Sequence, residues 1–445
     1  MQPKNTREKP DLFKIRLDQF IDMKHELVIL ADKITWSFFE EKFGAYYVDQ
    51  KGRSGTPIRL MVGLHYLKHG FNESDESVVY GFLENPYWPY FCGYEYFQKS
   101  LPIDPSSLTR FCKRIGSKGM EYFLQALLAA ARNVGALKDT HISKVIIDTT
   151  VQEKAIAFPT NARLYYKMRE KLVRAAAARG IERRKNYRRL AKKALSQQSG
   201  YSRAKQLRRA AGMTRQLKTY LGRVHRDIVR KAGQIDPALI QLLKQSSRLL
   251  EQSWDSKDKL YSIHAPETES ISEEGKAHKR YEFGCKVSLA TSSRDNWILG
   301  IQAHHGNPYD GHTLTATIAQ VERLTGSSVH DAYVDLGYRE HDYRGDAKVH
   351  IVNFRGTAKK KTRSIKYWLK RGSAIEPVIG HVKSDNGMAR NLLKGIEGDK
   401  INAILSGCGF NMRKLLAVFF LPLIIWQKMR HMFDTKPDQI VWFPV

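Results

Sequence analysis

The chain has 445 residues, of which 74 are Lys or Arg and 45 are Asp or Glu, so its formal net charge is +29. A positive excess of this size predicts a polyanionic partner, and double-stranded DNA or RNA is the first candidate. The four cysteines are too scattered for a disulfide framework or a paired-cysteine zinc site, which favours a reducing cytoplasm. The longest apolar run, residues 415–426, contains Pro422 and is too short to cross a bilayer, so we expect a buried C-terminal element and no membrane partner.

Residues 1–140 predict a mostly helical domain for DNA binding or dimerisation. Helices are expected over residues 57–68, 73–84 and 105–115, with Asp104 as the N-cap of the third. The HGFN junction between the first two resembles a helix-turn-helix, although plain packing explains it equally well. The aromatic stretch at residues 86–97 is punctuated by Pro and Gly, so it favours a core element over a base-stacking face.

A basic, helical insertion is predicted over residues 159–256. Between residues 163 and 231 there are 23 Lys and Arg against three acidic residues, which is too one-signed for an ordinary solvated face. Apolar residues between 207 and 228 recur every three or four positions, and SQQSGYS at 196–202 is expected to separate this helix from an earlier one. Asp236 followed by Pro237 indicates the start of another helix. Five basic residues are the candidate DNA contacts: Arg183, Arg184, Lys185, Arg188 and Arg189.

Strand signals surround this insertion and predict an α/β domain from residues 141–158 and 257–430, followed by a tail at 431–445. Strands are expected at 144–148, 259–264, 281–291, 297–303, 329–335 and 348–353, with helices at 310–324 and 367–383. Asp310 is expected to cap the first of these helices, and Pro377 to kink or restart the second. This order describes a mixed sheet with flanking helices.

Three acidic residues stand where a shared site could form. Asp148 and Asp335 end apolar, β-branched runs, and α/β sheets place ligands at the carboxyl ends of strands. Glu376 lies in the helical pattern with Lys383 seven positions later, so both are expected on one face. A single Asp at a strand end is more often a turn former, but three acids in a basic chain favour metal-dependent chemistry on phosphodiesters.

The ordered motifs also resemble bacterial insertion-sequence transposases of the DDE type, in the superfamily of the insertion-sequence four and five groups, whose catalytic domain resembles ribonuclease H. The matching stretches are IIDTTVQEKAIAFPTNARL, YEFGCKVSLATS, GIQAHHGNPYDGHTL, AYVDLGYR, SAIEPVIGHVK and GDKINAILSGCGFNMRKLL. The segment RLMVGLHYLKHGFNESDESVVYGFLENPYWPYFCG resembles the N-terminal domain of that group.

The resemblance implies that Asp148, Asp335 and Glu376 are the catalytic triad and hold two Mg²⁺ or Mn²⁺ ions. Lys383 and Arg371 would neutralise DNA phosphates near the cut, although related chains carry the arginine where this one has Gly372. It further implies a homodimer, associated with the bacterial nucleoid in the cytoplasm, that binds terminal inverted repeats, cleaves the ends and joins them to target DNA. Two alternatives stay open: an inactive transposase acting as a repressor, and a metal-dependent endonuclease that cuts without joining.

Overall fold

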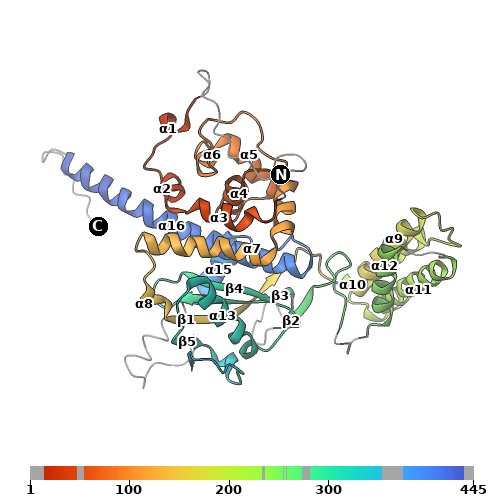
Figure 1. Ribbon diagram of the computed structural model, residues 1–445. Helices are drawn as coiled ribbons and strands as arrows, with labels where there is room; N and C mark the ends of the chain where they lie inside the picture. The colour runs from red at the N-terminus through yellow and green to blue at the C-terminus, as the bar shows by residue number, and fades with distance from the viewer. Residues whose placement is uncertain are drawn as a thin grey trace, which may run out of the picture.

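The computed structural model describes residues 15–47, 55–232, 236–253, 255–256, 258–272, 281–352 and 374–434, with side chains up to residue 420. The N-terminal region is helical, as predicted, and packs above the sheet (Figure 1). Its helices are α1 (Leu17–Phe20), α2 (Glu26–Lys33), α3 (Trp36–Gly44), α4 (Ile58–Phe71), α5 (Asp75–Glu84), α6 (Tyr87–Phe91), α7 (Ser106–Asn133) and α8 (Asp139–Ile142).

Local signals explain the ends of the central helices. Helix α4 stops at Asn72, whose φ of 58° is left-handed, and α5 starts at a capping box formed by Ser74 and Ser77. The N-cap of α7 is Pro105 and not Asp104 as predicted, but Asp104, one residue earlier, still accepts a hydrogen bond from the Ser106 backbone N–H at 2.9 Å and so satisfies an end group of the helix. The prediction for α7 was wrong in length, because the helix continues to Asn133 beyond a break at Gly116.

The aromatic stretch at residues 86–97 is core, as predicted. Phe91 and Tyr96 are buried, and the Phe91 ring meets Trp36 edge to face with ring centroids 5.4 Å apart. Helix α4 is also buried on most of its surface, His65 and His69 included. The surface of α4 is therefore occupied by its packing against α7 and α16.

A six-stranded mixed sheet forms the second layer, which confirms the predicted α/β class. Its strands are β1 (Lys144–Glu153), β2 (Glu269–Ser272), β3 (Tyr281–Ser292), β4 (Ile298–His304), β5 (Asp331–Val334) and β6 (Lys348–Ile351). The order β2-β3-β1-β5-β6 has β4 on β3, and β1 pairs antiparallel with β3 but parallel with β5. The turn η1 (Asp310–Thr313), helix α13 (Leu314–Thr325), the turn η2 (Leu336–Tyr338) and helix α15 (Ile375–Asp385) complete this layer.

Two strand predictions need correction. No strand forms at residues 259–264 within the described chain, and β2 begins only at Glu269, where it gains β3 as a partner. Strand β1 does not end at Asp148 but continues to Glu153, because β3 pairs with it along that whole length. Strand β5 pairs with β1 only up to Ile146, so Asp148 lies in the part of β1 that extends beyond its pairing with β5.

The insertion is a bundle of α9 (Asn161–Ala177), α10 (Arg188–Arg203), α11 (Leu207–Lys231) and α12 (Pro237–Glu251), set to one side of the sheet (Figure 1). It has its own apolar core, to which α11 contributes Leu217, Leu221, Val224 and Ile228. Asp236 caps α12 by accepting from the Leu239 backbone N–H at 2.8 Å, as predicted. SQQSGYS does not break the chain. Helix α10 runs through it, and the turn comes at Lys205, where φ is 56°.

Helix α16 (Gly395–Asp434) joins the two main layers, crossing between α4 and α7 on one side and β4 on the other (Figure 1). Leu415 and Leu416, the first two residues of the predicted apolar run, are buried there, whereas Ala417 and Phe420 are exposed, so the core prediction holds only for the start of the described part of the run. By length and composition, residues 395–420 are apolar enough to cross a membrane, but 61% of the relevant window is buried inside the protein.

Candidate active site

Asp148 and Asp335 come from neighbouring parallel strands at matching heights. The pairing register sets Ile146 opposite Tyr333, and Asp148 and Asp335 each follow two residues later. Because side chains alternate along a strand, Asp148 shares the face of Ile146. Asp335 stands directly after the last residue of β5, where its Oδ1 accepts from the Gly337 backbone N–H at 2.9 Å.

Glu376 approaches the same face from helix α15. The residue before it, Ile375, is buried in a small cluster with Ile146 and Tyr333. This packing holds the first turn of α15 over the two strands and leaves Glu376 exposed beside them. The first part of the helix expected over residues 367–383 lies outside the described residues, and Arg371 and Gly372 fall in that part. Pro377 sits in the first turn of α15, where proline is tolerated without a kink.

The carboxylates affect one another electrostatically. Burial, together with the charges of Asp335, Asp310 and Glu376, raises the pKa of Asp148 to about 7. The Thr149 backbone N–H, which donates to Asp148 Oδ1 at 2.7 Å, acts in the opposite direction. An acid whose pKa rises among like charges marks a place where a cation would be favourable.

Asp310 belongs to this group, although the sequence predicted only a helix cap. It opens η1 rather than capping α13, and its Oδ1 accepts from Thr149 Oγ1 at 2.9 Å and from Lys286 Nζ at 2.8 Å. The signal available in the sequence was an Asp after Asn-Pro-Tyr at the end of a strand segment, which turn chemistry explains just as well.

The residues present fit a divalent ion. All the candidate ligands are carboxylate oxygens, the donors that Mg²⁺ and Mn²⁺ prefer. A β-carbon at Gly337 would lie 3.0 Å from Asp335 Oδ1 and 3.4 Å from Asp310 Oδ2, so the glycine leaves room between them. Tyr338 is fully buried, and within the described chain its hydroxyl has no hydrogen-bond partner. The pKa of Tyr338 is raised well above its usual value by burial and by Asp148, Asp310 and Asp335.

A second polar cluster lies where the insertion joins the sheet. Among the described residues, Cys285, His305 and Asp399 form a group in which one potential metal-ligand atom of each residue lies within 4.8 Å of the other two. The carboxylates of Asp148, Asp335 and Glu376 are more widely spaced than this. Lys154 Nζ already lies 2.6 Å from Asp399 Oδ1 and 2.9 Å from Glu267 Oε1. Burial also raises the pKa of the Cys285 thiol, which disfavours the thiolate. We therefore interpret this cluster as a buried ion-pair junction.

The basic residues of the insertion form a solvent-facing surface. Of the 23 Lys and Arg between residues 163 and 231, all but Arg169, Arg183 and Lys218 are exposed. Arg183 donates from Nη1 to the Val173 carbonyl at 2.7 Å, so its guanidinium is partly committed to the fold. The other four candidate contacts, Arg184, Lys185, Arg188 and Arg189, are exposed.

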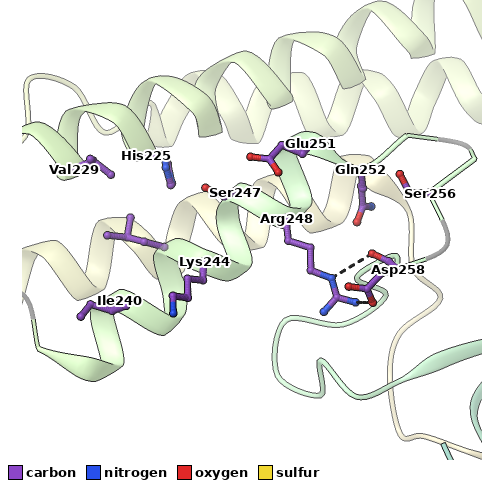
Figure 2. Close-up of a pocket in the computed structure, with 11 residues that line it drawn as sticks. His225, Val229, Ile240, Lys244, Ser247, Arg248, Glu251, Gln252, Ser256 and Asp258 are labelled. Carbon is purple, nitrogen blue, oxygen red and sulfur yellow. Dashed lines mark hydrogen bonds and ion pairs between the residues drawn. The ribbon is translucent and has the colours of Figure 1, made fainter. Parts of the chain in front are cut away.

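Two of the cavities formed by the described residues are lined by basic side chains. Lys383 lines a cleft of about 790 Å³ between the N-terminal helices and the segment joining α15 to α16, together with Lys113, Arg390 and Lys394. The other, of about 760 Å³, lies between α11 and α12 in the insertion, where Arg248 is paired with Asp258 (Figure 2). Of the two, only the Lys383 cleft contains a residue of the helix that carries Glu376.

Comparison with known proteins identifies the family of the chain. Residues 15–114 match a transposase domain family, and residues 261–408 match the transposase DDE domain family. An uncharacterized protein, ORF8 in the nfe locus of Rhizobium meliloti, is 49% identical over 198 residues, which cover 44% of this chain and 95% of that protein. No solved structure matches the chain at a significant level.

The chain therefore belongs to the DDE transposases, the insertion-sequence enzymes that its motifs resemble. Membership confirms the ribonuclease H-like fold class and an enzyme of transposition that acts on DNA. Enzymes of this family use divalent metal ions.

The raised pKa of Asp148 predicts a pH-dependent stability in the absence of metal. Above pH 7 the folded protein must carry this carboxylate charged among like charges, whereas below about pH 4 the carboxyl is neutral in both states. Its contribution to stability therefore falls as pH rises between about 4 and 7. In chelator, we expect Asp148→Asn to raise the melting temperature at pH 8 and to change it little at pH 4.

Asp331→Asn is the matched control, because Asp331 is ion-paired with Lys144 and His350 and its pKa is lowered. This control should be destabilising at pH 8. Melting curves in which Asp148→Asn is equally destabilising at both pH values would contradict the proposed repulsion.

Proposed function

We propose that this transposase binds the terminal inverted repeats of its element, cleaves the ends by metal-dependent hydrolysis and joins the freed 3′-hydroxyls to target DNA. The observation that carries the proposal is the convergence of Asp148, Asp335 and Glu376 from β1, β5 and α15 over the Ile146, Tyr333 and Ile375 cluster. Two ions, Mg²⁺ or Mn²⁺, would activate the attacking oxygen and stabilise the leaving oxygen.

In this proposal the three side chains divide the work of holding the ions. Asp148 and Asp335 lie at matching heights on adjacent strands, so they are suited to share one ion. Glu376, exposed on α15, would hold the second ion on the side from which DNA approaches. In the first step a water oxygen bonds to phosphorus and the 3′-oxygen leaves with a proton. In the second, that 3′-hydroxyl attacks a target phosphodiester and another 3′-oxygen leaves.

The basic surfaces would hold the substrate. The exposed Arg and Lys of the insertion are suited to phosphate contacts, which supply affinity without reading sequence. Lys383, on the helix of Glu376, would neutralise phosphates nearest the cut, as would Arg371. Because two ends must be handled together, we also propose that the working form is a homodimer.

The test uses the full-length protein and duplex DNA carrying the inverted repeats that flank its coding region. With Mg²⁺ or Mn²⁺ we expect a nick that leaves a 3′-hydroxyl at the element end, followed by joined products when target plasmid is added. With EDTA, neither product should form, while binding to the end persists in a mobility-shift assay.

Two results would contradict the proposal in different ways. Binding without cleavage under every metal condition would indicate a repressor derived from a transposase. Cleavage without joining, even with pre-cut ends that expose the 3′-hydroxyl, would indicate an endonuclease.

A further inference from the structure

We infer that Asp310 is a fourth carboxylate of the metal centre, contributing its Oδ2 as a ligand, and that Lys286 and Thr149 hold it in position. This inference rests on the proposed function of Asp148, Asp335 and Glu376.

Within the described chain, the side-chain hydrogen bonds that hold the Asp310 carboxylate all reach one oxygen, Oδ1. Its Oδ1 accepts from both Thr149 Oγ1 and Lys286 Nζ, and Lys286 Nζ also donates to the Pro308 carbonyl at 2.7 Å. These bonds tie the segment before η1 to β1 and β3, the strands that meet beside Asp148. Lys286 is largely buried, with 14% of its side chain exposed, so the position of Asp310 is well determined.

The second oxygen of Asp310 faces the proposed ion site. No hydrogen-bond donor from the described part of the chain contacts Oδ2. The β-carbon position at Gly337 lies 3.4 Å from Oδ2 and 3.0 and 3.6 Å from the two carboxylate oxygens of Asp335, so the two acids flank one small space. Beside this space is Tyr338, whose buried hydroxyl also lacks a partner among the described residues.

The coordination chemistry supports the same assignment. Mg²⁺ and Mn²⁺ take about six oxygen ligands. Three carboxylates, the substrate and water would leave a coordination position that a fourth carboxylate can occupy. Lys286 neutralises the charge that a fourth carboxylate adds while leaving Oδ2 available. The competing interpretation is that Asp310 is present only as the ion-pair partner of Lys286.

The experiment measures Mn²⁺ bound to the full-length protein without DNA. We expect Asp310→Asn, which keeps an oxygen acceptor for Thr149 and Lys286, to weaken Mn²⁺ binding by about tenfold or more. We also expect the hydration number of bound Mn²⁺, measured by electron paramagnetic resonance in ¹⁷O-water, to rise by one as water replaces the lost ligand. A purely electrostatic effect would weaken binding and leave that number unchanged.

Asp331→Asn is the matched control. Like Asp310, Asp331 is half-buried and paired with a lysine, but it lies at the end of β5 that is away from the proposed metal site. It should leave Mn²⁺ affinity within about twofold of the parent protein. Melting in EDTA checks the fold, and Asp310→Ser provides a second variant with a smaller side chain.

The outcomes separate this inference from the proposed function. Loss of Mn²⁺ affinity in Asp335→Asn, with unchanged affinity or unchanged hydration in both Asp310 variants, would overturn the role of Asp310 alone. Unchanged affinity in Asp335→Asn as well would overturn the metal centre itself.

Discussion

Replacing any one of Asp148, Asp335 and Glu376 by its amide is expected to lower cleavage of element ends by about a thousandfold or more. A metal ligand contributes several kcal/mol of transition-state stabilisation, and about 4 kcal/mol corresponds to three powers of ten in rate. Each amide keeps the shape of the side chain but removes the charge that holds the ion. Single-turnover cleavage of end-labelled DNA in Mg²⁺ is the measurement, with a mobility shift to show that end binding persists.

The control for these variants is Asp331→Asn, which removes a carboxylate from the start of β5, the strand that Asp335 follows, and this carboxylate is paired with His350. It should cleave at close to the parental rate. If Asp148→Asn or Glu376→Gln retained more than about a tenth of the parental rate, that residue would not be a metal ligand.

Neutralising Arg184, Lys185, Arg188 and Arg189 together is expected to weaken DNA binding by about a hundredfold at moderate salt. Each phosphate contact contributes about −0.9 to the slope of log affinity against log salt, so four contacts would flatten that slope by about 3 to 4. The reason is release of counterions from the DNA, which exposed guanidinium and ammonium groups produce. Titrations with element-end and unrelated duplexes between about 50 and 200 mM salt provide the measurement.

The matched control neutralises four exposed basic residues outside both the insertion and residues 1–140, with the same change in net charge: Arg294, Arg323, Lys348 and Arg413. Its salt slope should remain close to that of the parent. An unchanged slope in the insertion variant, accompanied by lost preference for the element end, would mean that these residues read bases instead of phosphates.

The insertion packs as a unit separate from the sheet that carries the acidic residues. Its apolar core is distinct from the core shared by the N-terminal helices and the sheet. The buried junction of Lys154, Glu267 and Asp399 lies where the chain leaves and re-enters the sheet, so it anchors both connections. A charged surface can thus vary on the insertion without disturbing the carboxylates.

Several features were predictable because they depend on local sequence. Helix starts at Asp236 and near Asp104, the apolar stripe of α11 and the strands around residues 281–304 follow from capping and periodicity. Errors arose where tertiary pairing overrode those signals. Strand β1 runs five residues past Asp148 because β3 supplies hydrogen bonds there, and residues 259–264 form no strand although their composition suits one.

By itself, the sequence determined the class of protein, through motifs that resemble DDE transposases, and the DNA partner, through its strong positive charge. Metal-dependent chemistry at the three acidic residues stays a prediction. Only the tertiary structure decided which carboxylates lie together. Asp310 is more than 20 residues from Asp335 and more than 150 from Asp148 in the chain, so no local pattern relates it to them. Strand register and the Lys286 contact bring it to the site, and both depend on long-range pairing of β1, β3 and β5.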